Sequence, residues 1–402
     1  MTTGHRTAPT THTAQPYPTG STGGSVSSCT VCSLKADHPG VVLDDQGVCN
    51  LCNLDFASDL LVNYRYTSEV FTEFQQAKAG PGEYDCLFMY SGGKDSTYML
   101  DKFANEYGKR VLAFTFDVPF ESVHAAQNIA LAREKIPATF VLDADDDNIK
   151  LMMREVFNRP APKKPGNYLD EKLPCVSCRT FFVLRAILMA YRQKIPYIAL
   201  CADPQQILTM ESNVREIVRD FYKTFGERLT DTLFGGQLEE LLFDDDENLP
   251  KIVFPFIAMR HEYDPDRIVA ELRAKGLYAS SPLETHCTLF PLLNYYSYTN
   301  FDCMFYKLNA ASHVRSVKRN ASYDRNTFSI KFPRSLDLAD VEERLGTVVR
   351  EIAAGEGDRD EHERTLIDLF QRMDAGEDAA RFVARSFLDM RSVAADLGIR
   401  LS

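Results

Sequence analysis

The chain has 402 residues, of which 45% are hydrophobic, so it is long enough for two domains or for one large domain with added segments. Its formal net charge of −12 argues against a general nucleic-acid binder, because such proteins are usually basic. No uninterrupted apolar run approaches the ~18 residues of a transmembrane helix, so no membrane span is expected.

The N-terminal segment 1–27 is rich in Thr, Ser, Gly and Pro and lacks the apolar centre of a signal peptide. This composition predicts a disordered leader and a cytoplasmic protein. In that reducing compartment the ten cysteines are expected to be free thiols or metal ligands rather than disulfides.

Four cysteines then follow in two pairs, Cys29/Cys32 and Cys49/Cys52, with sixteen residues between the pairs. Two such pairs at this separation fit a tetrahedral Zn²⁺ site with four thiolate ligands. A module this small cannot build its own core, so the metal would supply its folding energy. The pattern predicts a structural zinc module over residues 28–58, with a redox role or an iron site as the alternative.

A helical connector is predicted over 60–78, and Gly80-Pro81-Gly82 ends it. The apolar run 84–90 then predicts a buried strand, followed by the loop Ser91-Gly92-Gly93-Lys94-Asp95-Ser96 and the start of a helix. A strand, a glycine-rich turn and a helix N-terminus together form an anion site, because backbone N–H groups and the helix dipole point at the ligand. The loop therefore predicts a phosphate-binding site.

Apolar runs and helical patterns alternate through the next two hundred residues. The predicted strands are 84–90, 110–116, 138–142, 197–201 and 252–256. The predicted helices are 97–107, 122–135, 147–157, 179–193 and 264–275. This alternation predicts an α/β fold with a parallel sheet and helices on both faces, in which ligands bind beyond the carboxyl ends of the strands.

Two further segments are predicted to be helical. The stretch 211–248 reads as helical and then acidic, as in a lid or surface insertion. Beyond residue 335 the pattern predicts charged amphipathic helices, with one apolar stripe formed by Val341, Leu345, Val348, Val349 and Ile352. The predicted domains are therefore a catalytic domain over 80–305 and a mainly helical region over 306–402.

Basic residues concentrate in two segments of this acidic chain. Residues 150–194 hold ten Lys or Arg against three Asp or Glu, and residues 307–334 hold seven against one. Acidic residues gather at 143–147 and 244–247. These runs are either solvated faces or, for the basic segments, the lining of a site for an anionic substrate.

Three more cysteines, Cys175, Cys178 and Cys287, are one short of a closed zinc site. They suit a [4Fe–4S] cluster held by three thiolates with one iron left open, and buried cysteines without metal are the alternative. Cys175 and Cys178 stand at the start of a predicted helix, where the pKa of a thiol is expected to be lowered. Cys86, Cys201 and Cys303 lie in or near apolar runs and are predicted to be core residues.

The loop 91–96 resembles the SGGKDS signature of the PP-loop, or adenine nucleotide α-hydrolase-like, superfamily. The resemblance implies a Rossmann-like (HUP-type) domain in which Ser91, Gly92, Gly93, Lys94, Asp95 and Ser96 bind the pyrophosphate of ATP. It also implies catalytic roles for Lys94 and Asp95, with Asp95 a candidate contact of Mg²⁺. Asp117, at the end of the second strand, would lie beside the adenine and ribose.

The order of motifs along the chain resembles that of the TtcA/TtuA-type tRNA thiolases. It consists of a PP-loop, then Cys175-Val-Ser-Cys178-Arg179, then a lone Cys287 after Phe254–Arg260. The resemblance covers about residues 28–300. It implies a sulfurtransferase that adenylates a carbonyl oxygen, inserts sulfur with a [4Fe–4S] cluster on Cys175, Cys178 and Cys287, and releases AMP and pyrophosphate. Asp203 would keep part of the role of the motif that follows the fourth strand in those enzymes.

The implied partners are a sulfur donor or sulfur-carrier protein and a sulfur acceptor. The acceptor is tRNA, an anionic small molecule or a carrier-bound group. A homodimer is compatible with this function. His286 would be a surface histidine sooner than a proton shuttle.

Two other functions stay open. The cysteine module around Cys29 and Cys49 also resembles the start of N-acetyl sugar amidotransferases, which have the same loop and deliver nitrogen to an activated carboxylate. The trio of Cys175, Cys178 and Cys287 favours sulfur over nitrogen. A non-enzymatic ATP-sensing or scaffold subunit is the third hypothesis, and the intact Lys94-Asp95 pair argues against it.

Overall fold

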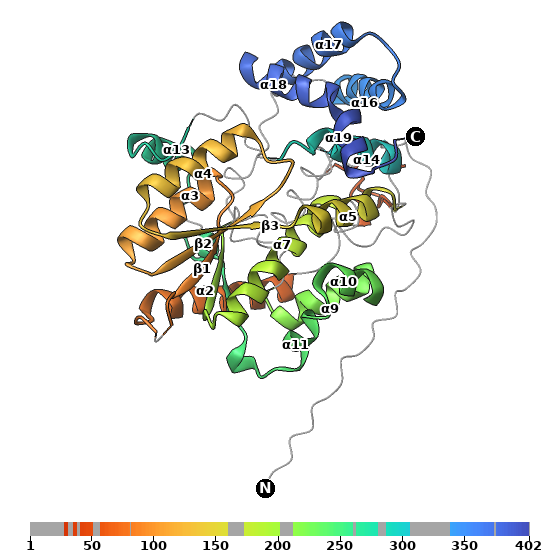
Figure 1. Cartoon of the computed structure of the whole chain (residues 1–402). Coiled ribbons are helices and arrows are strands. Elements are labelled where there is room, and N and C mark those ends of the chain that lie inside the picture. The colour runs from red at the N-terminus through yellow and green to blue at the C-terminus, as the bar shows by residue number, and fades with distance from the viewer. Residues whose placement is uncertain are drawn as a thin grey trace.

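The computed structural model describes residues 28–30, 35–37, 41–50, 57–80, 82–159, 173–201, 212–259, 263–279, 287–305, 338–373 and 375–401. Its centre is a five-stranded, all-parallel sheet with the strand order β3-β2-β1-β4-β5 (Figure 1). The strands are β1 (Cys86–Met89), β2 (Val111–Asp117), β3 (Thr139–Ala144), β4 (Tyr197–Leu200) and β5 (Lys251–Val253). The α/β fold with a parallel sheet, predicted from the alternating pattern, is confirmed, and its strand order is Rossmann-like, as the resemblance implies.

The central strand β1 is almost fully buried, as its apolar sequence requires. Leu87 pairs with Leu112 of β2 on one side and with Ile198 of β4 on the other. All five predicted strands are present. The last one is shorter than predicted and ends at Val253, because Pro255 begins the short helix α12 (Pro255–Ala258).

Helices cover both faces of the sheet, and the strand register shows which residues face which layer. Residues that pair directly across parallel strands point to the same face, so Phe88 shares its face with Ala113 and the opposite face carries Phe116. The ring centroids of Phe88 and Phe103 lie 5.3 Å apart, and those of Phe116 and Phe182 lie 4.3 Å apart.

The Phe88 side therefore packs against α3 (Lys94–Asp101) and its continuation, the π-helix η1 (Lys102–Glu106). The helix α4 (Val123–Lys135) follows β2, and α13 (Pro265–Ala274) packs against α3. The Phe116 side packs against α7 (Leu173–Arg192), which in turn contacts α5 (Asp146–Phe157).

The helix predicted as a connector is α2 (Ala57–Gln76), and it is part of the α/β core. Phe71 and Phe74 on this helix are buried, and Phe74 contacts the rings of Phe103 and Tyr197 at 4.8 and 5.3 Å. The helix packs against β5 and α12. Its apolar side therefore closes the end of the sheet.

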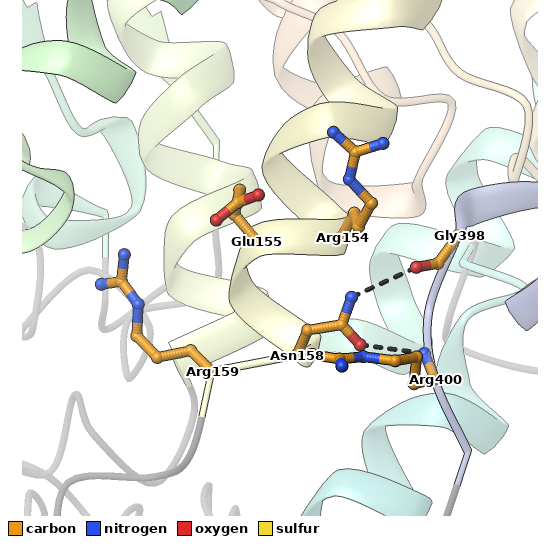
Figure 2. A pocket seen from close by; sticks show the side chains of 6 residues that line it. All are labelled: Arg154, Glu155, Asn158, Arg159, Gly398 and Arg400. Atoms are coloured by element: carbon orange, nitrogen blue, oxygen red, sulfur yellow. Dashed lines mark hydrogen bonds between the residues drawn. The ribbon is translucent and has the colours of Figure 1, made fainter.

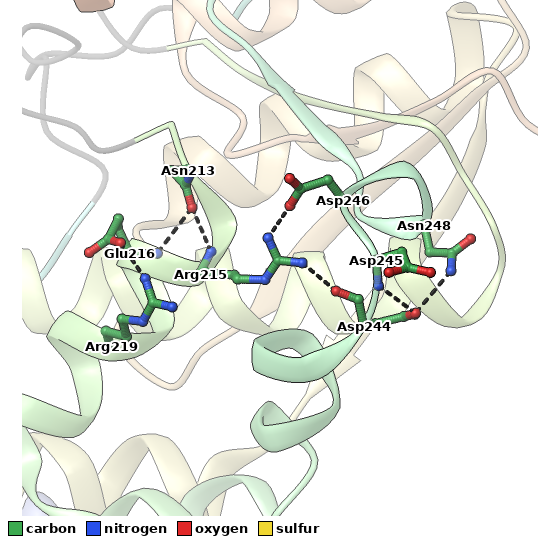
Figure 3. Close-up of polar contacts among 8 residues, drawn as sticks. All are labelled: Asn213, Arg215, Glu216, Arg219, Asp244, Asp245, Asp246 and Asn248. Carbon is green, nitrogen blue, oxygen red and sulfur yellow. Dashed lines mark hydrogen bonds and ion pairs between the residues drawn. The ribbon is translucent and has the colours of Figure 1, made fainter. Parts of the chain in front are cut away.

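The segment that was expected to be helical and then acidic forms α9 (Val214–Phe225), α10 (Glu227–Phe234), α11 (Leu238–Phe243) and the 3₁₀ helix η2 (Asp246–Asn248). The acidic run is held in place by neighbouring side chains (Figure 3). Arg215 contacts the carboxylate of Asp246 and the carbonyl oxygen of Asp244, and Tyr191 donates a hydrogen bond to the Asp244 carboxylate at 2.6 Å. These contacts give the run a structural role.

The C-terminal part of the chain is helical, as predicted. Its described residues form α16 (Leu338–Ala354), α17 (Arg359–Arg372), α18 (Glu377–Leu388) and α19 (Met390–Leu397), and α14 (Phe290–Phe301) precedes this region. All five members of the predicted apolar stripe on α16 are buried. The cysteine module touches this region, because Lys35 pairs with Glu342 of α16 at 3.6 Å.

One helix in the described part of the chain, from Pro174 to Arg192 in α7, reaches the length and mean hydropathy of a membrane span. Half of that stretch is buried inside the molecule. Core helices of globular domains meet the same criterion, so this is weak evidence for a membrane segment.

Candidate functional site

The loop 91–96 leaves the carboxyl end of β1, the strand at which the strand order of the sheet reverses. From β1 the chain passes to β2 on one side, and β4 later joins on the other side. At such a switch point the connections diverge and leave a crevice, which is where open α/β sheets bind ligands. Burial raises the pKa of the Cys201 thiol, and Cys86 and the charge of Asp95 raise it further. The loop and the end of β4 therefore lie close together.

Gly92 has a backbone conformation and surroundings that suit only glycine. Its φ angle is +71°, and a Cβ atom there would lie 2.6 Å from the carbonyl oxygen of Ala125. The loop backbone thus lies directly on the first turn of α4. This close approach explains the first glycine of the motif.

Asn128 of α4 is fully buried and fixes the loop from behind. Its Nδ2 donates a hydrogen bond to the carbonyl oxygen of Gly92 at 2.8 Å, and its Oδ1 accepts one from the N–H of Ala279 at 2.7 Å. The hydroxyl of Tyr90 donates to the Asn128 carbonyl oxygen at 3.2 Å. One side chain therefore joins the loop, α4 and the segment after α13.

The charged part of the loop is held by the segment that precedes α13. Lys94 Nζ lies 3.2 Å from Asp95 Oδ2, and the hydroxyl of Tyr263 donates a hydrogen bond to the same oxygen at 3.3 Å. Both charged side chains are mostly buried, at 17% and 16% exposure. A lysine, a carboxylate and a helix N-terminus in one partly buried place can bind a phosphate group together with a divalent cation.

The three cysteines of the predicted cluster converge from two distant segments. Cys175 and Cys178 stand near the start of α7, and Cys287 forms an isolated antiparallel bridge with Glu121, in the loop after β2. Burial raises the pKa of Cys178 well above its usual value, and Cys287 and Cys175 raise it further. Burial and Cys175 raise the pKa of Cys287 to about 12. Each thiol therefore lies within electrostatic reach of the others.

The expectation of a lowered thiol pKa at the start of this helix is wrong for Cys178. The helix begins at Leu173, six residues earlier than predicted, so Cys178 lies inside the helix rather than at its end. Burial and the neighbouring thiols outweigh any effect of the helix dipole. With their pKa raised in this way, Cys178 and Cys287 become thiolates only with a compensating cation, which is what a metal cluster provides.

No three His, Cys, Asp or Glu side chains within the described ranges are arranged to hold a single metal ion. A [4Fe–4S] cluster makes a different demand, because each thiolate binds its own iron. The donor set of three sulfurs fits the cluster, and the cluster stays a prediction.

Glu121 and Asp117 form an acidic pair that connects the cysteines with the loop. Burial, followed by the charge of Asp117, raises the pKa of Glu121 to about 7. Glu121 also acts on Tyr90, the residue before Ser91: after burial, it is among the groups that raise the pKa of that hydroxyl. The bridge partner of Cys287 thus lies close to the start of the loop.

Sequence reasoning missed Glu121, Asn128 and Tyr263. Glu121 stands four residues after Asp117, beyond the end of a strand, and this position could have identified it. Asn128 and Tyr263 lie far from the loop in the chain, and no local pattern distinguishes them.

The basic segment 150–194 divides between two roles. Arg185 Nη2 and Nε donate to the Asp143 carboxylate at 2.7 and 2.8 Å, and Arg185 Nη1 lies 3.1 Å from Asp145. This arginine and part of the acidic run 143–147 thus neutralise each other. Arg154 and Arg159, near the end of α5, instead line a cavity beside the C-terminal segment of the chain.

Half of the predicted zinc site is described. The N–H of Cys49 donates a hydrogen bond to Cys29 Sγ at 3.3 Å, and both cysteines are buried. Cys29 and Cys49, one cysteine from each predicted pair, are therefore in contact. Cys32, Cys52, Asp203 and His286 lie outside the described residues, so the zinc site and the role of Asp203 stay predictions.

The predicted core cysteines show the expected environments. Cys86 and Cys303 are buried, and Cys201 is partly buried with a raised pKa.

No protein-family model and no curated protein sequence matches the chain. Among the solved structures that match, two illustrate how distant the similarity is. One is the U34-tRNA thiolase NcsA from Methanococcus maripaludis with its [4Fe-4S] cluster, with 17% identity and a TM-score of 0.31 over 78% of this chain and 92% of that one. The other is NMN synthetase from Francisella tularensis, with 9% identity and a TM-score of 0.25 over 63% of this chain and 94% of that one. Neither similarity is close enough to assign an activity.

Proposed function

We propose that the protein uses ATP to adenylate a carbonyl oxygen of its substrate and then replaces that oxygen with sulfur. The observation that supports this best is the convergence of Cys175, Cys178 and Cys287 next to Glu121, which stands in the loop after β2. The loop 91–96 without the cysteines would be equally consistent with nitrogen transfer.

The reaction has two steps. In the first, the carbonyl oxygen attacks the α-phosphorus of ATP and pyrophosphate leaves. In the second, a sulfur nucleophile adds to the same carbon, and AMP leaves with the original oxygen. When bound, a [4Fe–4S] cluster with three thiolate ligands has one open iron, which can carry sulfide.

The residues of the loop have clear tasks in the first step. Lys94 and the backbone N–H groups at the start of α3 stabilise the negative charge that develops on pyrophosphate. Asp95, oriented by Tyr263 at 3.3 Å, offers a carboxylate oxygen to Mg²⁺, the hard cation that bridges phosphate oxygens. Asn128 keeps the loop backbone in place before ATP arrives, so binding costs little reorganisation.

The test is the iron and acid-labile sulfide content after anaerobic purification. We expect about four iron atoms per chain, as a cubane cluster requires, and their loss in Cys287→Ala. The matched control is Cys303→Ala, which removes a buried thiol just after α14 and should keep the iron.

Turnover is followed as AMP release from ATP, with bulk tRNA as acceptor and sulfide or glutamine as donor. Sulfide-dependent release that requires Cys287 supports the proposal. A chain that contains zinc alone and releases AMP with glutamine or ammonia would be an amidotransferase, and the proposal would be wrong.

A further inference from the structure

An open cavity of about 460 Å³ lies between the end of α5 and the C-terminal segment of the chain (Figure 2). The residues that line it are Arg154, Glu155, Asn158, Arg159, Gly398 and Arg400. Five of the six carry a polar or charged side chain. Such a lining suits a charged ligand and offers little to an apolar one.

The two sides of the cavity are joined by Asn158. Its Nδ2 donates a hydrogen bond to the carbonyl oxygen of Gly398 at 3.2 Å, and its Oδ1 accepts one from the N–H of Arg400 at 2.9 Å. The C-terminal segment is thus fixed against α5. As a result, arginines that are far apart in sequence stand around one opening.

The side chains of Arg154 and Arg159 are positioned by different contacts. The stem of Arg154 lies against Gly398, where an added Cβ would be 3.1 Å from Arg154 Cδ. Arg159 donates from Nη1 to the carbonyl oxygen of Thr224 at 2.7 Å and lies over the ring of Phe225. Within the described residues, neither Arg154 nor Arg400 forms an ion pair, so both guanidinium groups can receive a ligand.

The charge of the lining favours an anion. The lining contains three arginines and one carboxylate, that of Glu155. Arg154 in the last turn of α5 also stabilises the helix dipole, which is the ordinary reason for a basic residue there. That reason does not apply to Arg159, beyond the end of the helix, or to Arg400, which comes from another part of the chain.

We infer that this cavity binds a phosphate group through Arg154, Arg159 and Arg400. The planar guanidinium group presents paired N–H donors that match two phosphate oxygens, which makes arginine the usual residue for such recognition. The inference rests on the proposed function only in identifying the phosphate as part of the sulfur acceptor. The acceptor would then be an RNA, through its backbone, or a small phosphate ester.

The test uses Lys94→Ala as the starting protein, to weaken phosphate binding at the loop. In this background, Arg154→Gln/Arg400→Gln is compared with Arg133→Gln/Arg364→Gln, which removes the same charge from exposed arginines of α4 and α17. The probes are inorganic phosphate, followed by thermal stabilisation, and a labelled single-stranded RNA, followed by fluorescence anisotropy. Circular dichroism verifies that each variant folds.

We expect the cavity variant to lose most of the stabilisation by phosphate, while the control variant keeps it. If the natural ligand is RNA, the cavity variant also binds RNA about tenfold more weakly. The negative slope of log K against log salt then becomes smaller in magnitude by roughly 1.4, for two lost contacts. If RNA binding is unchanged but phosphate stabilisation is lost, the ligand is a small phosphate ester. Equal behaviour of the two variants toward both probes would overturn the inference. None of these readouts depends on iron content or turnover, so they are separate from the test of the proposed function.

Discussion

Asn128 donates a hydrogen bond from Nδ2 to the carbonyl oxygen of Gly92 across 2.8 Å, and it does so from a fully buried position. The side chain of a helix that follows β2 thereby shapes the loop that follows β1. The geometry of the proposed nucleotide site depends on this contact between two adjacent βα units.

Replacement of Asn128 by leucine keeps the branched shape of the side chain and removes the hydrogen bonds. We expect the free energy of unfolding to fall by about 2–4 kcal/mol, because the Gly92 carbonyl and the Ala279 N–H lose their buried partner. ATP affinity should fall at least about tenfold, measured by calorimetry. In the control Asn300→Leu, which removes a hydrogen bond to Tyr296 in α14, ATP affinity should not change. Tight ATP binding by Asn128→Leu would show that the loop holds its shape alone.

Gly92→Ala tests the close approach of the loop to α4. The control is Gly108→Ala, because Gly108 also has a positive φ angle, +60°, but an added Cβ would meet no atom within 4 Å. The control should cost about 1 kcal/mol, for the left-handed backbone alone. Gly92→Ala should cost about 2–4 kcal/mol, since the contact with the Ala125 carbonyl adds overpacking. Urea unfolding measures both values, and equal costs would contradict the predicted clash.

Tyr263→Phe tests the orientation of Asp95. Loss of one hydrogen bond to a carboxylate should weaken binding of ATP with Mg²⁺ by about three- to tenfold, an effect of about 1 kcal/mol. The matched control is Tyr191→Phe, which removes a hydrogen bond to Asp244 and should leave nucleotide binding as it is. The prediction is wrong if the two variants bind ATP equally well.

Asp85 gives a prediction about pH. Burial alone would raise the pKa of its carboxyl group, but hydrogen bonds from the Arg110 side chain and backbone and from the Gly80 N–H outweigh burial and lower it. A lowered pKa in the folded state means that the ionised group stabilises the fold above its unfolded pKa, near 4, and that this contribution disappears as the pH falls through the folded value. Asp85→Asn should therefore lower the free energy of unfolding by about 1–3 kcal/mol at pH 7 and at pH 5.

The difference between wild type and Asp85→Asn should become smaller below about pH 4, in urea unfolding at several pH values. The control Glu271→Gln removes an exposed charge that pairs with Arg267, and it should change stability by less than about 0.5 kcal/mol. A difference for Asp85→Asn that stays constant down to pH 3 would contradict the assignment.

The fold was predictable because its elements are encoded locally. The run from Cys86 to Met89 is apolar throughout, as a strand buried on both faces must be, and Gly92 marks the turn after it. The start of α7 was misplaced because Pro174 was not recognised as a residue of the first helical turn, a position that proline favours. The role of α2 was underestimated because its polar exposed side hides the buried Phe71 and Phe74.

The site was predictable only in part, because its contacts are long-range. The motif identifies the loop, yet nothing near Gly92 in the sequence indicates that Asn128 holds it or that Tyr263 contacts Asp95. Likewise, the bridge between Glu121 and Cys287 joins segments that no periodicity relates. Such partners follow from the packing of distant elements.

The pairing of Phe88 with Ala199 has a consequence for how the molecule is made. β1 emerges from the ribosome long before β4, and parallel pairing between segments so far apart in the chain forms slowly, because a large loop must close first. A nascent chain that stops short of Ala199 contains the complete phosphate motif but only one neighbour for its central strand. The ability to bind nucleotide should therefore arise late in synthesis, in a single step, when β4 reaches the sheet.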